Sequence, residues 1–306
     1  MIPDLFAENL TMDVNVALAG IRSRIPELED VARAFAILID ERRSLVLDGV
    51  QWPKAVDFDA TAFSSGVPLL ANQDLSGLQG CYLSSAEKLL PVLERAFPSI
   101  GSSAASLQSG LIERPDLAHR CLEMILTGDL KVLEATAQAA GVAVEVLSFL
   151  VLEIVKPCLR QAAVKFAHLA DNELWYKGYC PVCGGGPDIG FLKDKRDPSE
   201  FLISKTGQLW PHCSLCGHIW RFVRLVCPSC GQTDHERLDV FTAQGREKER
   251  IHACRDCKRY VLVIDLVGSN EKLDPDMAPI GLIHLDILAQ ERGYSPLART
   301  PWNLFR

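Results

Sequence analysis

The sequence predicts an α plus small-β protein, in which a helical N-terminal domain is followed by two tandem rubredoxin-like, or zinc-ribbon, metal-binding domains. Two observations support this prediction. Apolar residues recur at helical spacing through the first half of the chain, and four Cys-x-x-Cys motifs lie close together in the second half. The chain has 306 residues, of which 48% are hydrophobic, so it can bury more than one core.

The expected domain boundaries follow changes in composition along the chain. Residues 1–170 read as a mainly helical domain without chemistry of its own, since helical periodicity predicts packing and little else. Turn residues, β-branched residues and the paired cysteines then mark a first four-cysteine ribbon over 171–222 and a second over 223–267. The tail over 268–306 is polar and carries one amphipathic helix, expected over 280–291.

Start and stop signals locate the helices of the first half. In chain order they are Pro26 near a helix start, the capping-box pattern Ser84-x-x-Glu87, a helix over 115–126, Asp129 and Gly141 around the next helix, and a long helix from Val142 that Pro157 breaks or kinks. The stretch from Gly49 to Gly80 shows no clear period and reads as loops and turns. Three unpaired cysteines in apolar surroundings are interpreted as buried core thiols: Cys81, Cys121 and Cys158.

The strongest chemical signal is a set of eight cysteines in four knuckles. A two-residue spacer lets both sulfurs of a knuckle face one ion, and two knuckles supply the four thiolates of a closed tetrahedral site. In three of the knuckles a glycine follows the second cysteine, where it permits a backbone geometry that a β-carbon resists. The predicted ligands are Cys180, Cys183, Cys213, Cys216, Cys227, Cys230, Cys254 and Cys257.

A repeat within these knuckles indicates how they pair. The string Cys-Pro-x-Cys-Gly begins at Cys180 and again at Cys227, 47 residues later, and each copy is followed by a plainer knuckle. The simplest interpretation is sequential pairing, with one site in each ribbon, while an interleaved pairing stays open. The strands expected between and after the knuckles are 201–203, 220–226, 241–242 and 260–264.

Histidine and aromatic residues also lie beside the knuckles and are candidates for further ligands or contacts. His212, His218 and His252 are expected to support the sites or lie at the surface, because eight thiolates already fill two four-coordinate sites. Trp220, Tyr179 and Tyr260 either pack under the metal or anchor a partner. Whether the two ions only stabilise the fold or act chemically stays open.

Charge and hydropathy narrow the function class. The formal net charge of −7 favours a protein partner over nucleic acid. Residues 171–267 contain 14 Lys and Arg against 13 Asp and Glu, and four thiolates around each divalent ion would make this region acidic, which is the wrong sign for binding phosphates. The N-terminus lacks the pattern of a secretory signal, and the most apolar stretch is interrupted by Glu145 and Glu153. We therefore expect a cytoplasmic protein without membrane insertion.

The second half of the chain resembles the FdhE family of formate dehydrogenase accessory proteins. The resemblance is carried by the order of the knuckles, by the string Cys-Ser-Leu-Cys-Gly-His-Ile-Trp from Cys213, and by the segment from Ile280 to Tyr294. It is sharp over 179–294 and general in the helical half. All eight knuckle cysteines match. The family is associated with rubredoxin-like iron, so the resemblance implies two iron ions per chain, with zinc as the alternative.

The function that the resemblance implies is that of a cytoplasmic maturation factor, not an enzyme. Its implied partner is the molybdenum- and iron–sulfur-containing catalytic subunit of a respiratory formate dehydrogenase. Two alternatives remain from the residues themselves: a rubredoxin-like electron-transfer or redox-sensing protein, and a zinc-ribbon protein that binds nucleic acid. No nucleophile–base constellation and no phosphate-binding loop is evident in the sequence.

Overall fold

A computed structural model describes residues 12–45, 47, 58–71, 73, 77–194 and 207–304. These residues form two compact units, which are built from non-contiguous parts of the chain. The helical unit comprises Glu29–Val56 and Gln73–Ala162, and the sheet unit comprises Met1–Leu28, Asp57–Asn72 and Ala163–Arg306. The domain boundaries predicted at residues 170, 222 and 267 would divide the chain into pieces that fold independently. These boundaries stay predictions.

The helical unit consists of helices whose ends mostly follow the local signals in the sequence. Asp129 caps α7 by accepting a hydrogen bond from the Lys131 amide, and Gly141 ends that helix at φ +66°. Its helices are α2 (Glu29–Ser44), α4 (Leu78–Ala96), α5 (Gly101–Glu113), α6 (Pro115–Thr127), α7 (Leu130–Ala140) and most of α8 (Val144–Phe166). The short 3₁₀ turn Pro98–Ile100 precedes α5.

One helix signal was interpreted wrongly from the sequence, and at a second signal one of the two predicted outcomes does not occur. Ser84 lies inside α4, which begins at Leu78, because Leu78, Cys81 and Tyr82 already bury their side chains before the supposed cap. The long helix α8 is not broken at Pro157, since it continues to Phe166. In both cases burial of an apolar face outweighs a local breaking or capping preference.

The three unpaired cysteines of the first half are buried as predicted, but two of them are not free thiols. Cys81 on α4 and Cys158 on α8 form a disulfide with their Cα atoms 6.0 Å apart, while Cys121 on α6 stays a free, buried thiol. Helical periodicity places each cysteine on a buried face, but it does not say which two faces meet.

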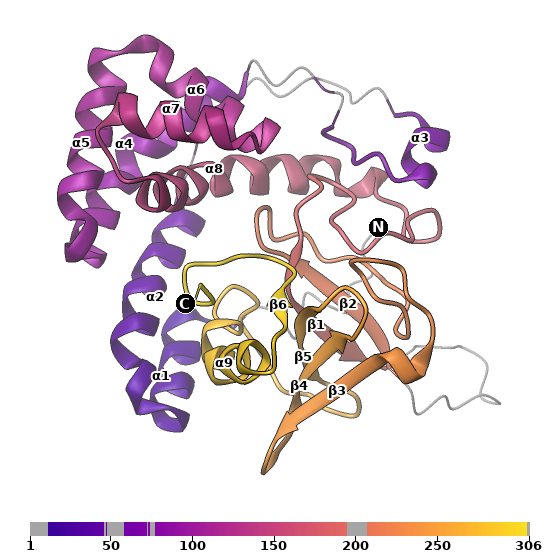
Figure 1. Ribbon diagram of the computed structural model, residues 1–306. Helices are drawn as coiled ribbons and strands as arrows, with labels where there is room; N and C mark the ends of the chain where they lie inside the picture. Colours follow the sequence, from indigo (N-terminus) through magenta and orange to yellow (C-terminus); the bar gives the residue numbers. More distant parts are fainter. Residues whose placement is uncertain are drawn as a thin grey trace. The chain divides into compact units, whose positions relative to one another are not determined.

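The sheet unit contains one sheet to which both predicted ribbons contribute (Figure 1). Its path order is β2-β1-β5-β4-β3, and β6 pairs with β5. The parallel pairing of β1 with β5, with Ile189 opposite Leu262, joins the two ribbons, and all other neighbours on that path are antiparallel. The strands are β1 (Pro187–Lys193), β2 (Gln208–Cys213), β3 (Leu238–Ala243), β4 (Arg246–Cys254), β5 (Arg259–Asp265) and β6 (Ser295–Pro296).

The strand predictions were partly right. Residues 241–242 lie in β3 and 260–264 lie in β5. The returning strand expected over 220–226 is wrong, because this segment makes a single bridge, from Phe222 to Leu209, with Ile219 just before it bridging His212. The strand expected over 201–203 lies outside the described residues.

The tail forms the helix that the sequence predicts. A 3₁₀ turn over Ile280–Leu282 leads into α9 (Ile283–Glu291), and Gly293 follows at φ +79°. Leu282, Leu285 and Ala289 pack with β-strand residues such as Phe191 and Leu262 in one core. The helix thereby covers one face of the sheet.

The sheet unit also contains α1 (Val14–Arg24), the turn Pro26–Leu28, α3 (Ala60–Ser65) and the 3₁₀ turn His235–Arg237. An additional 3₁₀ turn, Ala167–Leu169, follows α8. Among the described residues, no helix combines the length and the apolar character needed to cross a membrane.

Candidate metal centres

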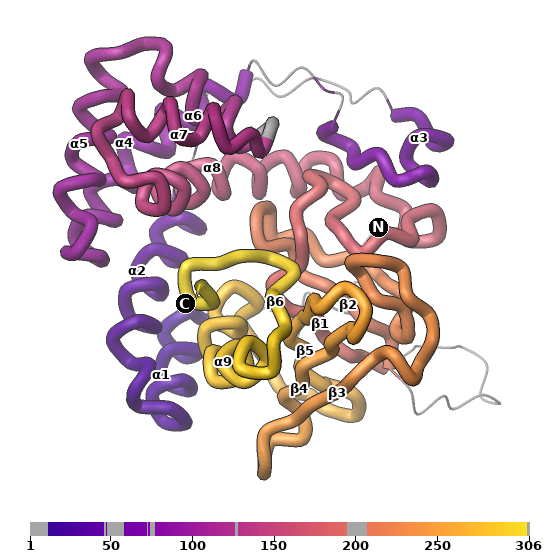
Figure 2. The backbone as a smooth tube through the Cα atoms, viewed as in Figure 1, coloured from indigo at the N-terminus to yellow at the C-terminus, as the bar shows by residue number. Residues whose placement is uncertain are grey.

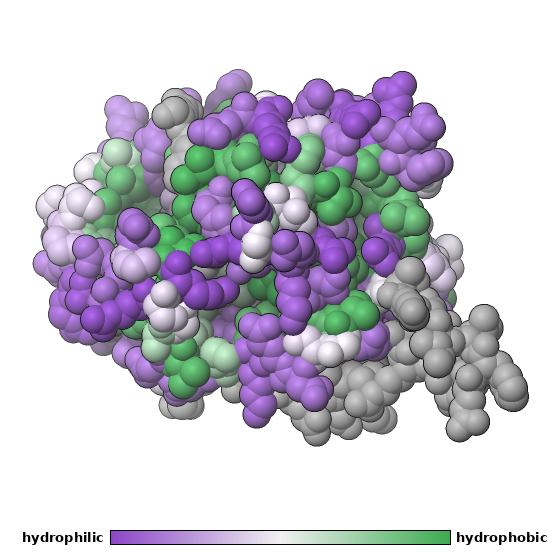
Figure 3. All heavy atoms as spheres, turned by 90° about the horizontal axis from the view of Figure 1, so that it is seen from below, coloured by the Kyte–Doolittle hydropathy of each residue, from purple (hydrophilic) through white to green (hydrophobic). Residues whose placement is uncertain are grey.

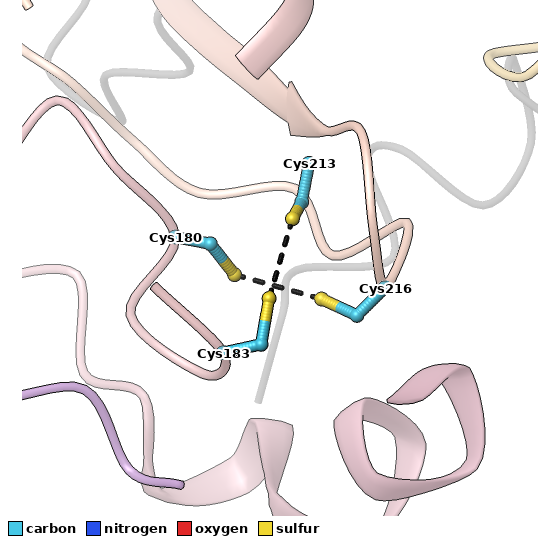
Figure 4. Close-up of side chains that lie close together, drawn as sticks. All are labelled: Cys180, Cys183, Cys213 and Cys216. Carbon is cyan, nitrogen blue, oxygen red and sulfur yellow. Dashed lines mark hydrogen bonds between the residues drawn. The ribbon is translucent and has the colours of Figure 1, made fainter. Parts of the chain in front are cut away.

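The structure gathers the eight predicted ligands into two groups of four sulfurs. The first group is Cys180, Cys183, Cys213 and Cys216, and the second is Cys227, Cys230, Cys254 and Cys257, with all sulfurs of a group within 4.8 Å of one another. This is the sequential pairing, and the interleaved alternative does not occur. In the first group the sulfurs point inward from two loops, with Cys180 3.6 Å from Cys216 and Cys183 3.5 Å from Cys213 (Figure 4).

These separations fit a tetrahedral ion. Four sulfurs placed about 2.3 Å from one zinc or iron ion lie about 3.8 Å from each other. The closest pairs in the second group, Cys227 with Cys257 and Cys230 with Cys254, are 3.6 Å and 3.7 Å apart. Four soft donors at this spacing fit a soft divalent metal and leave no ligand position for a substrate. The residues present therefore suit the implied ion.

The same backbone turn builds all four knuckles. In each, the amide that follows the second cysteine donates to the carbonyl of the first cysteine, at 2.9 Å (Gly184), 3.1 Å (Gly217), 3.0 Å (Gly231) and 3.0 Å (Lys258). The donors all have positive φ, at 79°, 71°, 75° and 56° in that order. The glycines in the first three knuckles are explained by this geometry. Lys258 is the only non-glycine residue with positive φ in the part of the chain that the structure describes.

The first site is supported by a segment that the sequence did not connect with it. The amides of Leu69 and Leu70 donate to the carbonyls of Pro181 and Val182 at 2.9 Å and 3.0 Å, within the first knuckle. The Tyr179 hydroxyl donates to the Gly66 carbonyl at 2.7 Å. The segment that carries α3 therefore lies beside the first knuckle, although more than a hundred residues separate them (Figure 2). The sequence predicted only loops and turns for this stretch and did not indicate that it contacts the first metal site.

The two sites differ in exposure. In the first, Cys180, Cys213 and Cys216 are buried and Cys183 is half-buried. In the second, Cys230 is exposed to solvent and Cys257 is half-buried, while Cys227 and Cys254 are buried. The first knuckle of the second site lies in a loop before β3, whereas the other knuckle forms the turn between β4 and β5. One edge of the second site is therefore open to solvent.

The two sites are also linked by close backbone packing. Gly178 precedes the first knuckle, and a β-carbon at this position would overlap both the carbonyl oxygen and the Cα atom of Pro228, in the third knuckle. Gly178 itself is buried. Only glycine allows the two backbones to approach this closely. Glycine is therefore required at position 178 by the contact between the two sites, and not by the geometry of a turn.

The acidity of the cysteines indicates why a cation belongs between them. Burial raises the pKa of Cys180 and Cys216 well above that of a free thiol. Hydrogen bonds from Cys180 and Cys213 instead hold the pKa of Cys183 well below that value. Buried sulfurs this close cannot all carry negative charge unless a positive ion compensates them, so full ionisation is coupled to metal binding.

None of the three neighbouring histidines joins a sulfur group. His212 is buried, with Nδ1 2.9 Å from Asp188 Oδ1 and Nε2 3.7 Å from Asp276 Oδ1. Burial lowers the pKa of His212, but the neighbouring anionic groups, Asp188 and then Asp276 and Cys213, together more than offset this, so the pKa lies above its usual value. His218 is buried and His252 half-buried, and burial lowers the pKa of each to about 4. None of the three histidines is fully exposed.

The aromatic residues beside the knuckles pack inside the sheet unit. Trp220 is fully buried and donates from Nε1 to the Lys177 carbonyl at 3.2 Å. Tyr260 is buried, and its hydroxyl lies 2.5 Å from Asp286 Oδ1 on α9. These residues were expected either to pack beside the metal sites or to anchor a partner. For Trp220 and Tyr260 the structure supports packing.

The unequal exposure predicts two phases of metal loss. We expect protein prepared without chelator to hold close to two ions, and a chelator to remove the ion of the second site at least about tenfold faster, because its open edge admits the competing ligand. Elemental analysis over a time course measures the release and identifies the metal, and a red ferric form that bleaches on reduction identifies iron. Release of both ions in one phase would contradict the expected difference.

Comparison with known proteins gives relatives of one kind. No family model matches the chain. A protein from Aquifex aeolicus described as "Protein FdhE homolog" is 33% identical over 161 residues, covering 52% of this chain and 53% of that protein. A homologue of the same name from Stutzerimonas stutzeri is 30% identical over 121 residues, covering 38% and 35%. The chain thus matches about half the length, or less, of these curated relatives.

One solved structure shares the fold over nearly the whole chain. It is the crystal structure of the FdhE protein from Pseudomonas aeruginosa, with a TM-score of 0.65 and 21% sequence identity, covering 95% of this chain and 94% of that one. The arrangement of a helical N-terminal region followed by a sheet region is therefore a fold already known from a crystal.

Proposed function

The chain is a relative of the FdhE proteins, as its sequence predicts, and on this basis we infer that it is an accessory factor for the maturation of a respiratory formate dehydrogenase. In this role it binds the catalytic subunit of that enzyme in the cytoplasm, before or around the time of export, and acts as a chaperone. It catalyses no reaction itself.

The observation that carries this proposal is the closed character of both sulfur groups. Each group offers four cysteine ligands within 4.8 Å of one another. A catalytic metal in a hydrolytic enzyme keeps one position open for water or substrate, whereas a four-sulfur site is filled by the protein. An ion held in such a site either stabilises the surrounding fold, and with it a binding surface, or exchanges an electron. A protein whose role is to bind a partner is compatible with either role of the ion.

Iron is the metal that we propose for both sites, with zinc as the alternative. The resemblance to the FdhE family carries this proposal, because four thiolates bind either metal. When bound, iron would supply a one-electron couple, and zinc would act only in folding.

The test is co-purification of a formate dehydrogenase catalytic subunit with the tagged, intact chain. The informative variant replaces Cys227 and Cys230 by Ser, and the matched control is Cys121→Ser, which removes a free thiol of the helical unit. We expect the double variant to recover at least about tenfold less subunit, a loss of about 1.4 kcal/mol in binding, and to lower formate dehydrogenase activity in cells. The control should behave as the unmodified protein does.

Two results would overturn parts of this proposal. If the intact chain recovers no formate dehydrogenase subunit and binds nucleic acid tightly instead, the accessory role is wrong. If the double variant binds the subunit and restores activity as well as the intact chain, the second ion is dispensable for the role.

A second candidate function is electron transfer or redox sensing at the second site. The exposure of Cys230 favours it, since an ion with one ligand at the surface can exchange electrons or be released. Reversible reduction of the bound ion without any effect on partner binding would favour this candidate over the first.

A further inference from the structure

The sheet has a second face, opposite α9, that carries an apolar hollow. The strand register places Val240 on β3, His252 on β4 and Val261 on β5 side by side across the sheet. All three line the hollow, together with residues of the segment 224–228 that borders it. The hollow is open at its mouth and contains about 730 Å³ of space, solvent at the mouth included.

Apolar side chains line the hollow and continue from it onto the surface. Leu209 and Val261 form its buried part, at 3% and 5% exposure. Leu225 and Val240, at its mouth, are 62% and 57% exposed. On the face shown in Figure 3, hydrophobic residues reach the surface among hydrophilic ones. In the hollow, exposed and buried apolar side chains line the same site, as in sites that bind an apolar chain segment.

The charge of the hollow is opposite to that of the whole chain. Arg224, Arg250 and Arg259 line it, while the chain has a net charge of −7. Asp239 is the only acidic residue among the described residues of the lining, and its carboxylate already accepts from Arg255 at 2.6 Å and from the Tyr294 hydroxyl at 2.9 Å. Apart from the two cysteines of the second metal site, Cys227 and Cys254, the lining is therefore both apolar and cationic.

Two of the three arginines are available to an incoming anion. Arg250 is paired with Asp265 at 2.5 Å. Arg259 donates from Nη1 to the Pro296 carbonyl at 2.9 Å, and its other N–H groups can donate to a bound anion. Within the described residues, no carboxylate pairs with Arg224. A carboxylate beside an apolar side chain is the group that this pair of arginines complements.

The edge of the sheet extends the same surface. β3 is the last strand in the sheet order and, among the described strands, pairs only with β4. An extended peptide can lie along such an edge, alternating its side chains so that every second one faces the hollow. The open mouth, the exposed apolar rim and this edge suit an extended chain better than a small enclosed molecule.

We propose that the groove between β3 and the segment 224–228 binds an extended, acidic and apolar peptide segment of a partner protein. This inference rests on the proposed accessory function, because it assigns the surface through which a partner subunit is held. The groove is also lined by Cys227 and Cys254 of the second site, so a bound segment covers that site.

The experiment selects peptides from a random displayed decapeptide library on the intact, metal-loaded chain and measures the affinity of those recovered. We expect enrichment of Leu, Ile or Val with Asp or Glu. Arg224→Glu should weaken the selected peptides at least about tenfold, because it places a carboxylate against a carboxylate. Leu225→Ser should weaken them by a similar factor, because it removes the exposed apolar rim.

Matched controls lie outside the lining. Lys272→Glu makes the same charge reversal at an exposed position. Ile287→Ser makes the same apolar-to-polar change at an exposed side chain of α9, the helix that packs on the other face of the sheet. Both should keep the affinity within about twofold, since neither residue lines the groove. All four variants should retain two ions, which shows that the sheet unit remains folded.

Three results would overturn the proposal: recovery of no binding peptide, enrichment of Lys- or Arg-rich peptides, or selected peptides that bind the Arg224→Glu variant as well as the unmodified chain. If decanoate binds to the groove and no peptide does, the peptide proposal is also wrong, and the occupant is a small anionic amphiphile. Because the library contains no formate dehydrogenase, this result and the co-purification result are independent, and the failure of one is distinguishable from the failure of the other.

Discussion

Replacing both Cys180 and Cys183 by Ser is expected to remove one of the two ions and to unfold the region around β1 and β2. The metal of a four-thiolate site contributes about 10–16 kcal/mol, which is comparable with or larger than the 5–15 kcal/mol that stabilises a whole domain. Cys213 and Cys216 are buried, so without the ion the two remaining sulfurs of the group would lose their common partner inside the protein. Elemental analysis should find about one ion, held by the second site.

The helical unit provides an internal control for this variant. Its helices have a core of their own, which includes the Cys81–Cys158 disulfide and the buried Glu153 paired with Lys156 at 2.6 Å. The far-UV circular dichroism of its helices should therefore persist, while proteolysis within β1 and β2 becomes faster. The reciprocal variant, with Ser at Cys227 and Cys230, should retain the ion of the first site. Loss of both ions from both variants would show that the sites fold as one cooperative unit.

Gly178→Ala is expected to disturb both sites through a single added methyl group. The β-carbon would overlap backbone atoms of Pro228, which cannot move aside as a flexible side chain can. Relief requires the first and third knuckles to separate, at a cost of at least about 3 kcal/mol. For a protein of this size we expect Tm to fall by about 10 °C and both ions to leave faster in the presence of a chelator.

Gly186→Ala is the matched control for this substitution. Gly186 lies on the other side of the first knuckle in the chain, its φ is not positive, and a β-carbon there would meet its nearest neighbour, the Leu297 carbonyl, at an ordinary 3.4 Å. This variant should keep Tm and both ions nearly unchanged. Equal destabilisation by the two substitutions would mean that the close packing of Gly178 on Pro228 is not what links the sites.

The local elements could be predicted because their determinants lie within a few residues. Asp129 and Gly141 bracket α7 through hydrogen bonds that span one turn. The glycine after the second cysteine in three knuckles indicates positive φ, and all three glycines have it. Where local signals failed, as at Ser84 and Pro157, burial of a whole helix face decided the outcome.

The sequence by itself determined the eight clustered cysteines and their sequential grouping, because the knuckle spacing and its repeat are properties of short stretches of chain. Tertiary structure alone decided that the two ribbons share one sheet through β1 and β5, that Cys81 meets Cys158, and that Leu69 and Leu70 bind the first knuckle. It also decided that Cys230 is exposed and that a cationic groove lies opposite α9. These features join residues far apart in the chain, and they depend on which apolar faces pack together, which periodicity within a single element does not specify.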